Sequence, residues 1–152
     1  MSMPLERDVE TLRRIPLFAG LPTARLKLIA YTAEVVEFAP GETIIRQGDP
    51  ADAVYILTEG EADVSIRDSD GHELELPTMG RNSLFGEVAV LSKGRRTTTI
   101  RARSRVATFK ISADVFLDLV RQSPEISMQV MTVLAQRLES SSALLQKHQH
   151  HV

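Results

Sequence analysis

The segment VYILTEGEADVSI, residues 54–66, contains two short apolar-rich runs on either side of the dipeptide Glu59-Gly60. Runs of this length that end at a glycine turn are typical of β-strands. The same pattern extends over residues 35–111. Further alternating runs lie at 73–76 and 106–111. Further turn dipeptides are Pro40-Gly41, Gly48-Asp49 and Asp70-Gly71. This part of the chain therefore predicts antiparallel strands joined by tight turns, in a sandwich or a rolled barrel.

Helical patterns flank the strands on both sides. Residues 5–14 and 21–33 carry apolar side chains at helical spacing, and prolines separate the two segments. After the strands, Ser112 and Ser123 each precede an apolar pattern with helical spacing. Each serine is expected to cap a helix, the second with Pro124 at its first position. We therefore expect a mainly β fold with flanking helices.

Composition indicates one globular domain over residues 1–152. The chain is 43% hydrophobic and 25% charged, and its length allows a substantial core. No apolar run approaches the ~18 residues of a membrane span, and the first ten residues lack the apolar region of a signal peptide, so we expect a cytoplasmic protein. A net charge of −2 predicts no basic footprint for nucleic acid, and the lack of cysteine excludes disulfides and thiolate-bound iron–sulfur clusters.

The stretch FGEVAVLSKGRRTTTIRA, which begins at Phe85, combines residues suited to a cyclic phosphodiester. Gly86 lets the backbone approach a ligand closely, and the start of a short helix after it provides N–H groups that favour an anion. Arg96, expected on the following strand, can bind two phosphate oxygens with one guanidinium. The carboxylate of Glu87 would repel a phosphate, so it is better suited to accept a hydrogen bond from a ribose hydroxyl.

Each of these residues also has a simpler interpretation. Phe-Gly-Glu alone is more often a turn than a ligand site, and arginines that cluster in sequence usually form a solvated surface. The clustered arginines are Arg81, Arg95, Arg96, Arg101, Arg103 and Arg105. The joint spacing of glycine, acid, apolar run and delayed arginine, inside a strand-rich chain, favours the binding site.

The same stretch resembles the phosphate cassette of cyclic nucleotide-binding domains, found in catabolite activator proteins, protein kinase A regulatory subunits and cyclic nucleotide-gated channels. In that family FGE is followed by apolar residues, a variable loop, and Arg with small residues and Thr or Val. Here the matching parts are Phe85-Gly86-Glu87, 88–91, 92–95 and Arg96-Thr97-Thr98-Thr99. Further matching turns lie at 40–42, 47–49 and 55–60, and the start of the family's lid helix matches 123–125.

The resemblance covers nearly the whole chain and implies its organisation. It implies an antiparallel β-roll, jelly-roll-like and of the double-stranded β-helix type, at 35–111, with the phosphate cassette at 85–99. N-terminal helices would occupy 1–34, hinge and lid helices 112–146, and a tail 147–152. The implied ligand-binding residues are Phe85, Gly86, Glu87, Val88, Ala89, Arg96, Thr97 and Thr98.

The resemblance also implies a role for each of these groups. Glu87 would bind the ribose 2′-OH, Arg96 the exocyclic phosphate oxygens, and the amides of residues 88 and 89 the rest of the phosphate. Arg95 stands where many members have proline, and Asn82 where glycine is common. Neither departure removes a ligand group. An Arg96→Glu substitution is expected to abolish binding while leaving the fold intact.

The sequence leaves the choice between cAMP and cGMP open. In the family, Thr directly after the arginine, here Thr97, is associated with contacts to phosphate and to the 2-amino group of a syn guanine, which permits cGMP, while Thr98 stands where alanine is common. The bacterial character of the lid favours cAMP. The candidate base contacts are the apolar Val64, Leu76 and Met79, which are also typical core residues, and Ser141 with Ser142 of a partner chain, which are equally suited to plain solvation.

The last helix is expected to carry two apolar stripes. Ile126, Val130, Val133 and Leu134 form the first stripe, which is suited to lie over the roll. Met128, Met131, Ala135, Leu138, Ser142 and Leu145 form the second, at the spacing of a two-stranded coil. We therefore expect a homodimer through the second stripe, although a helix that packs wholly into its own core is the alternative.

The expected function is that of a stand-alone, non-catalytic sensor. Ligand would draw the cassette inward, the hinge between Ser112 and Ser123 would relax, and the lid helix would close over the base. The chain reaches Val152 without a helix-turn-helix, so we expect no nucleic-acid partner and an output through a separate effector. The alternatives are an oligomerisation module with a degenerate pocket, or the regulatory domain of a larger protein.

An enzyme is the competing class of function. A cupin-like metal site needs two or three histidines with an acid on facing strands, and a haem sensor needs an axial ligand. The histidines are His72 in a turn and His148, His150 and His151 in the tail. We therefore expect no enzyme activity, no metal and no cofactor besides the nucleotide ligand.

Overall fold

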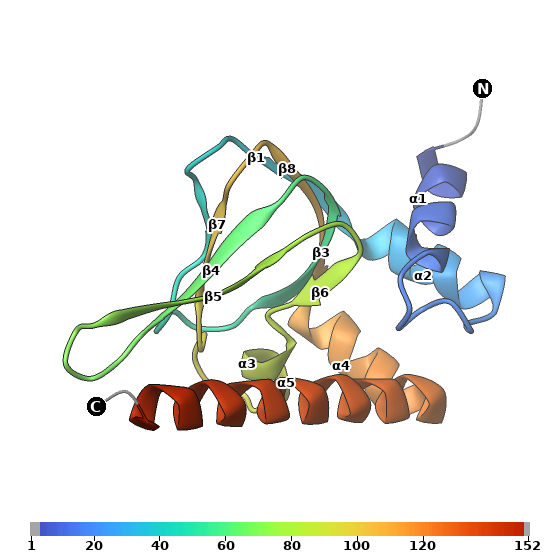
Figure 1. Cartoon of the computed structure of the whole chain (residues 1–152). Coiled ribbons are helices and arrows are strands. Elements are labelled where there is room, and N and C mark those ends of the chain that lie inside the picture. The colour runs from blue at the N-terminus through green and yellow to red at the C-terminus, as the bar shows by residue number, and fades with distance from the viewer. Residues whose placement is uncertain (1–3, 151–152) are drawn as a thin grey trace.

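The computed structural model describes the backbone of residues 4–150 and the side chains of residues 8–132, 134–136 and 138–139. Two helices, eight strands, a short helix between strands and two final helices follow one another along the chain (Figure 1). In order they are α1 (Pro4–Arg13), α2 (Thr23–Thr32), β1 (Glu34–Phe38), β2 (Thr43–Ile45), β3 (Ala53–Glu59), β4 (Ala62–Arg67), β5 (Glu73–Met79), β6 (Ser83–Phe85), α3 (Glu87–Leu91), β7 (Thr99–Ala102), β8 (Val106–Ser112), α4 (Ala113–Gln122) and α5 (Pro124–His150).

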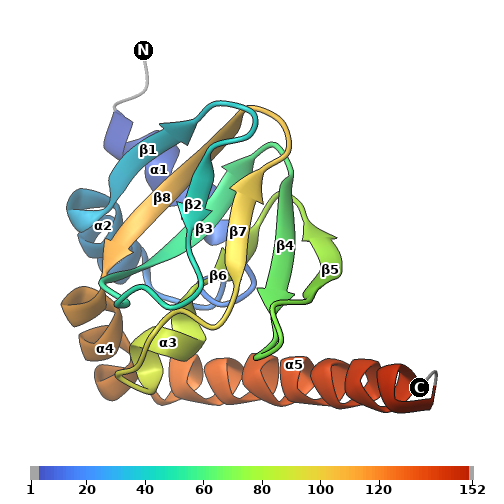
Figure 2. The same ribbon diagram turned by 90° about the vertical axis from the view of Figure 1, so that its left-hand side faces the viewer.

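The strands form two four-stranded antiparallel sheets, with strand orders β1-β8-β3-β6 and β2-β7-β4-β5 (Figure 2). The predicted β-roll is therefore confirmed. The turn at Glu59-Gly60 does not close a two-stranded hairpin, because β3 pairs with β6 and β8 while β4 pairs with β5 and β7. It instead carries the chain from one sheet to the other, which closes the roll.

Strand β3 separates two apolar cores, because successive side chains of a strand point to opposite faces. Val54 and Ile56 pack into a core shared with α1, α2, α4 and the start of α5. Ala53, Tyr55 and Leu57 pack into the interior of the roll, together with Phe85. The start of β3 lies beside the start of α4, because the N–H of Ala113 donates at 2.9 Å to the carbonyl of Asp52, the residue before β3.

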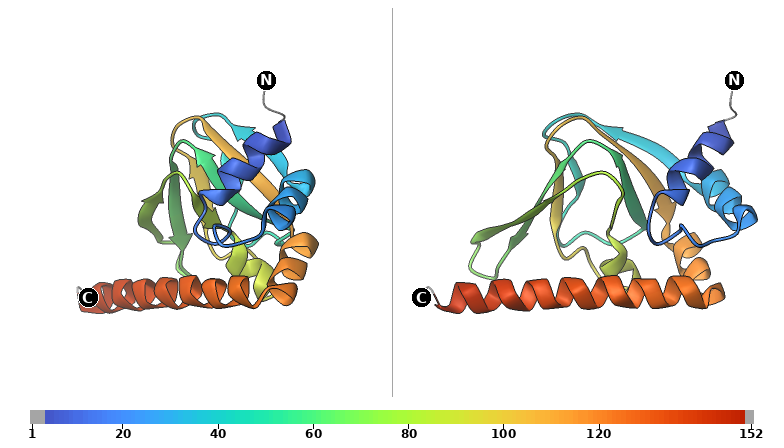
Figure 3. Two further views of the ribbon diagram at one scale, coloured as in Figure 1. Left: turned by 90° about the vertical axis from the view of Figure 1, so that its right-hand side faces the viewer. Right: turned by 45° about the vertical axis from the view of Figure 1, so that its right-hand side comes forward.

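The two final helices begin where the sequence predicts. The hydroxyl of Ser112 accepts from the N–H of Val115 at 3.3 Å, and that of Ser123 accepts from the N–H of Ile126 at 3.3 Å. Each serine thus satisfies a donor of the first helical turn. Helix α5 then runs as one rod across the open end of the roll (Figure 3). No helix in the described part of the chain combines the length and apolar character needed to cross a bilayer.

The two stripes of α5 differ as the sequence predicts. Ile126 and Val130 are buried, with 1% and 4% of their surface exposed. Met128, Met131 and Leu138 of the second stripe are 61%, 55% and 69% exposed. The side chains of Val133, Ser141, Ser142 and Leu145 lie outside the described residues.

Candidate functional site

Gly86 forms a sharp corner between β6 and α3. Its φ of 86° is left-handed, a conformation that residues with a Cβ rarely adopt. A Cβ at this position would lie 2.6 Å from Nη1 of Arg96. Glycine is therefore needed here both for the backbone conformation and for the close approach of the arginine.

Arg96 lies against this corner with only 5% of its surface exposed. Its Nη1 donates to the carbonyl of Gly86 at 3.1 Å, and its Nη2 donates to the carbonyl of Ala53 at 2.7 Å. Nη2 also reaches Oδ1 of Asp52 at 3.4 Å. A guanidinium that is removed from water needs such acceptors, and the main chain provides two of them.

An aromatic pair forms one side of the arginine's environment. The guanidinium carbon of Arg96 lies 5.9 Å from the centroid of the Tyr55 ring, a cation–π distance. Tyr55 stacks on Phe85 with centroids 5.4 Å apart and planes 10° apart. The two rings come from neighbouring strands, because Tyr55 of β3 is in register with Phe85 of β6.

The segment around Arg96 corrects one sequence prediction. Arg96 was expected on a strand, but it precedes β7, which begins at Thr99. It is fixed by the turn after β2 instead: the N–H of Arg96 donates to the carbonyl of Asp49 at 2.8 Å, and its own carbonyl accepts from the N–H of Gly48 at 2.9 Å. Both main-chain groups are thereby occupied while the side chain points inward.

Glu87, the first residue of α3, is buried with 1% of its surface exposed. It directly follows Gly86, whose carbonyl accepts a hydrogen bond from Arg96, so a buried acid is next in sequence to the glycine that the buried cation contacts. Ala89 is also buried, and Val88 is half-buried. The first N–H groups of a helix have no partner within it, so this corner also offers main-chain donors.

The remaining predicted contacts lie in two places. Thr97 is exposed and Thr98 half-buried, in the segment between Arg96 and β7. Val64 is buried in the interior of the roll, where Leu76 and Met79 pack against the same core. The predicted contacts of Ser141 and Ser142 lie outside the described side chains. The roles of all these residues remain predictions.

A pocket of about 460 Å³ adjoins Arg96, and we call it the Arg96 pocket. Its lining is Thr43, Ile44, Ile45, Arg46, Asp49, Pro50, Asp52, Tyr55 and Arg96. Its volume lies within the range of small-molecule sites. Apart from Arg96, none of the predicted ligand-binding residues lines it.

Sequence reasoning missed the residues that position Arg96. Asp52, the carbonyl of Ala53 and the ring of Tyr55 all come from the start of β3 and the turn before it. The available signal was the turn Gly48-Asp49-Pro50, which comes directly before a strand with an aromatic residue.

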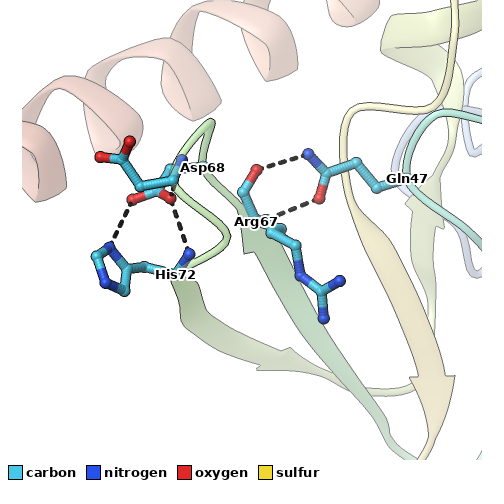
Figure 4. Close-up of polar contacts among 5 residues, drawn as sticks. Gln47, Arg67, Asp68 and His72 are labelled. Atoms are coloured by element: carbon cyan, nitrogen blue, oxygen red, sulfur yellow. Dashed lines mark hydrogen bonds and ion pairs between the residues drawn. The ribbon is translucent and has the colours of Figure 1, made fainter.

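A second polar cluster lies at the tip of the β4–β5 hairpin, where Asp68, Asp70 and His72 have ligand atoms within 4.8 Å of one another. All three are exposed. Oδ1 of Asp68 accepts from the main-chain N–H of His72 at 2.9 Å, and the imidazole lies 3.6 Å from Oδ2 (Figure 4). These bonds, the N–H of His72 above all, hold the pKa of Asp68 below its usual value. They account for the cluster as a turn-stabilising arrangement.

Comparison with known proteins identifies the family to which this fold belongs. A family model described as "Cyclic nucleotide-binding domain" matches residues 35–123, which include the corner from Gly86 to Arg96. The chain belongs to the cyclic nucleotide-binding domain family. A CRP-like cAMP-activated global transcriptional regulator of Mycobacterium tuberculosis is 30% identical over 133 residues, which make up 88% of this chain and 59% of that protein.

Members of other classes in the family are also similar. A cAMP-dependent protein kinase regulatory subunit of Blastocladiella emersonii is 34% identical over 109 residues, 72% of this chain and 27% of that subunit. The crystal structure of Thermus thermophilus Catabolite Activator Protein superposes with a TM-score of 0.75 at 27% identity, covering 86% of this chain and 62% of that one. The chain thus spans less than two thirds of each of these relatives.

Proposed function

We propose that this chain is a non-catalytic sensor that binds cAMP or cGMP at the corner of Gly86, Glu87 and Arg96. The observation that supports this most is the buried guanidinium of Arg96, which contacts the carbonyl of Gly86 directly beside the buried Glu87. A cyclic nucleotide presents one diester anion and one ribose hydroxyl. A cation and an acid at a single glycine corner can bind both groups at once.

In this proposal the guanidinium of Arg96 gives up its contact with Asp52 and binds the phosphate of the ligand in its place. Asp52 is the weakest of its three acceptors, at 3.4 Å and with 73% of its side chain exposed. An exposed ion pair contributes little, so the exocyclic phosphate oxygens can replace the carboxylate. The carbonyls of Gly86 and Ala53 keep the guanidinium oriented meanwhile, and the amides of Val88 and Ala89 bind the remaining phosphate oxygen.

Glu87 makes the site selective for ribose. A buried carboxylate close to a phosphate repels it unless a donor lies between them, and the ribose 2′-OH is that donor. Loss of this hydroxyl would remove the ligand's own donor to the carboxylate. We therefore expect 2′-deoxy-cAMP to bind more weakly than cAMP by about tenfold or more.

The proposed output is a movement of the last two helices. Helix α3 contacts β3 and α4, and α4 contacts α5. A ligand that draws α3 inward would thus shift α4 as the hinge and close α5 as the lid over the base. Ligand can drive this change only by binding the closed state more tightly than the open one.

The base of the nucleotide has its own proposed contacts. Val64, Leu76 and Met79 would line the base, and Ser141 and Ser142 would bind it across a dimer. Thr97 and Thr98 would adjust the choice between cAMP and cGMP.

We propose a homodimer through the exposed stripe of α5. Met128, Met131 and Leu138 are all more than half exposed on a helix whose opposite face is buried, which is typical of an interface helix. Met131→Glu should shift sedimentation from dimer to monomer, whereas Gln129→Glu, elsewhere on the same helix, should not. A wild-type monomer at high concentration would overturn this part of the proposal.

The relatives include a transcriptional regulator and a kinase regulatory subunit, of which this chain matches only a part. We propose residues 1–152 as a single nucleotide-sensing domain, with the output carried by a partner protein or by further chain. We propose no nucleic-acid contact for these residues.

Calorimetric titration with cAMP and with cGMP tests the binding proposal. Wild-type protein should give a saturable 1:1 heat with at least one of them. Arg96→Gln and Glu87→Gln should weaken binding by more than about tenfold, because each removes a charge-assisted contact. Arg121→Gln is the matched control, since Arg121 is exposed on α4 and, among the described side chains, pairs only with Asp118 at 3.4 Å.

Two results would overturn the proposal. One is a folded wild-type protein that gives no saturable heat with either nucleotide, which would favour an oligomerisation module with a degenerate pocket. The other is nucleotide binding that Arg96→Gln and Arg121→Gln weaken equally.

A further inference from the structure

A second pocket, of about 510 Å³, lies on the outer face of the sheet β2-β7-β4-β5, and we call it the outer pocket. Its lining is Thr43, Arg46, Gln47, Gly48, Ser65, Arg67, Asp68, Glu73, Thr99 and Arg101. Ser65 and Thr99 are in register on β4 and β7, and both alternate with buried neighbours such as Val64 and Ile100. The pocket therefore faces away from the interior of the roll.

Three arginines line this pocket, together with two acids, Asp68 and Glu73. Within the described part of the chain, Arg46, Arg67 and Arg101 form no ion pair, and no hydrogen bond uses their side chains. By contrast, the nearby Arg103 and Arg105 pair with Asp63 and Glu37. Arg67 and Arg101 lie on the neighbouring strands β4 and β7, and Arg46 follows β2. The three arginines outnumber the two acids of the lining, so the pocket carries a positive formal charge in a chain whose net charge is −2.

The pocket also offers neutral donors beside the cations. The hydroxyls of Thr43 and Ser65 make no hydrogen bond with other described residues, and Thr99 Oγ1 accepts from the N–H of Gln47 at 3.0 Å, which leaves its own proton free to donate. Guanidinium groups and hydroxyls together are the usual partners of phosphate oxygens.

The frame that holds Arg67 is rigid. The side chain of Gln47 donates to the carbonyl of Arg67 at 2.9 Å and accepts from its N–H at 2.7 Å, so the turn after β2 is tied to the end of β4 (Figure 4). The guanidinium of Arg67 points away from the Asp68–His72 pair (Figure 4). Asp68 already accepts a hydrogen bond from the N–H of His72. Glu73 is in register with Arg67 on the neighbouring strand, but no ion pair joins the two side chains.

We propose that the outer pocket binds a linear di- or triphosphate group, free or as part of a nucleoside polyphosphate, between Arg46, Arg67 and Arg101. A linear polyphosphate presents more anionic oxygens over a longer span than a single phosphate, so it is better suited to three guanidiniums that come from three separate segments. The pocket is separate from the Gly86 corner. It adjoins the Arg96 pocket, because Thr43 and Arg46 line both.

Calorimetry with inorganic tripolyphosphate at low ionic strength tests this proposal on the whole chain. Wild-type protein should give saturable 1:1 binding, and Arg67→Gln and Arg101→Gln should each weaken it by about tenfold. Both side chains are exposed, so the variants should fold normally. Arg121→Gln on α4 is the matched control and should bind as wild type does.

A second arm separates this site from the nucleotide corner. Tripolyphosphate should bind to Arg96→Gln, and to wild-type protein saturated with cAMP, with unchanged affinity. ATP in place of tripolyphosphate distinguishes the sources: equal affinity means that the phosphate chain alone is recognised, and tighter binding means a nucleoside polyphosphate. Three results would overturn the proposal. The first is no saturable heat with tripolyphosphate, and the second is equal weakening of its binding by Arg121→Gln and Arg101→Gln. The third is that cAMP competes with tripolyphosphate for wild-type protein while Arg101→Gln binds tripolyphosphate as tightly as wild type does.

Discussion

Arg96 and the three arginines of the outer pocket belong to the same roll but lie in opposite environments. Arg96 has 5% of its surface exposed and donates to two main-chain carbonyls, whereas Arg46, Arg67 and Arg101 are exposed and have no ion pair with other described residues. A buried charge costs free energy unless the fold supplies partners, while an exposed one is satisfied by water. Arg96 therefore supports the fold as well as the proposed nucleotide site, whereas the other three arginines contribute only to the proposed outer site.

The largest expected effect is on Arg96 itself. Arg96→Ala leaves the carbonyls of Gly86 and Ala53 without their donor, and should lower the free energy of unfolding by about 2–4 kcal/mol. Arg101→Ala should change it by less than about 0.5 kcal/mol. Urea denaturation of the two variants measures this difference. Equal and small losses of unfolding free energy in the two variants would contradict the distinction between the buried and the exposed arginines.

This expectation also corrects the sequence analysis. The sequence predicts that Arg96→Glu abolishes binding and leaves the fold intact. The structure places the side chain where a carboxylate would face two carbonyl oxygens, so loss of binding and loss of stability should come together. Binding assays on such variants therefore need a parallel measurement of folding.

The next effect concerns Gly86. Gly86→Ala must adopt a φ of 86° and place its Cβ 2.6 Å from Nη1 of Arg96, so it should lose about 1–2 kcal/mol of stability and weaken nucleotide binding. Gly41→Ala is the matched control, because Gly41 has a φ of 88° but no atom within 4 Å of the added Cβ. The difference between the two variants, in thermal unfolding and in calorimetry, isolates the contact with Arg96. No difference would mean that this contact is unimportant.

A smaller effect is expected at Asp52. Its side chain is 73% exposed, so Asp52→Asn should change the free energy of unfolding by at most about 0.5 kcal/mol. Affinity for the cyclic nucleotide should rise a few-fold at low salt, because a carboxylate that competes with the phosphate for Arg96 is removed. Asp63→Asn, an exposed acid 4.0 Å from Arg103, is the control. A large fall in affinity for Asp52→Asn would contradict this role.

The smallest effect is expected at the hairpin tip. The N–H of His72 lowers the pKa of Asp68, so the carboxylate stabilises the fold above the ordinary pKa of an aspartate. This contribution is lost as the pH falls through the lowered pKa of the folded state. The stability difference between wild type and Asp68→Asn should therefore be small and constant near neutral pH, and should vanish in strong acid. A difference that grows on acidification would contradict this sign.

The sequence predicts most of the fold because its signals are local. Glycine turns, strand alternation and the caps Ser112 and Ser123 each depend on a few neighbouring residues, and all appear in the structure. The pairing of strands was not local: the order β1-β8-β3-β6 joins strands far apart in sequence, and the turn at Gly60 gives no indication that β3 and β4 lie in different sheets.

The candidate site shows the same difference between local signals, which the sequence carries, and non-local contacts, which it does not. The motif from Phe85 to Arg96 identifies the corner from its own spacing. The partners that hold Arg96, namely Asp52 and the carbonyl of Ala53, are more than forty residues away, and a main-chain carbonyl carries no sequence signature at all. The outer pocket was missed for the same reason, because its three arginines come from the turn after β2 and from strands β4 and β7, which only the fold brings to one pocket.

The most direct test of the central claim is a crystal structure of the whole chain grown with cAMP, with the distance from Arg96 to the ligand phosphate as the measured quantity. We expect the guanidinium to lie about 3 Å from an exocyclic phosphate oxygen, with Glu87 accepting from the ribose 2′-OH. A bound nucleotide whose phosphate lies elsewhere, for example against Arg67 and Arg101, while Arg96 keeps Asp52 as its acceptor, would contradict the account.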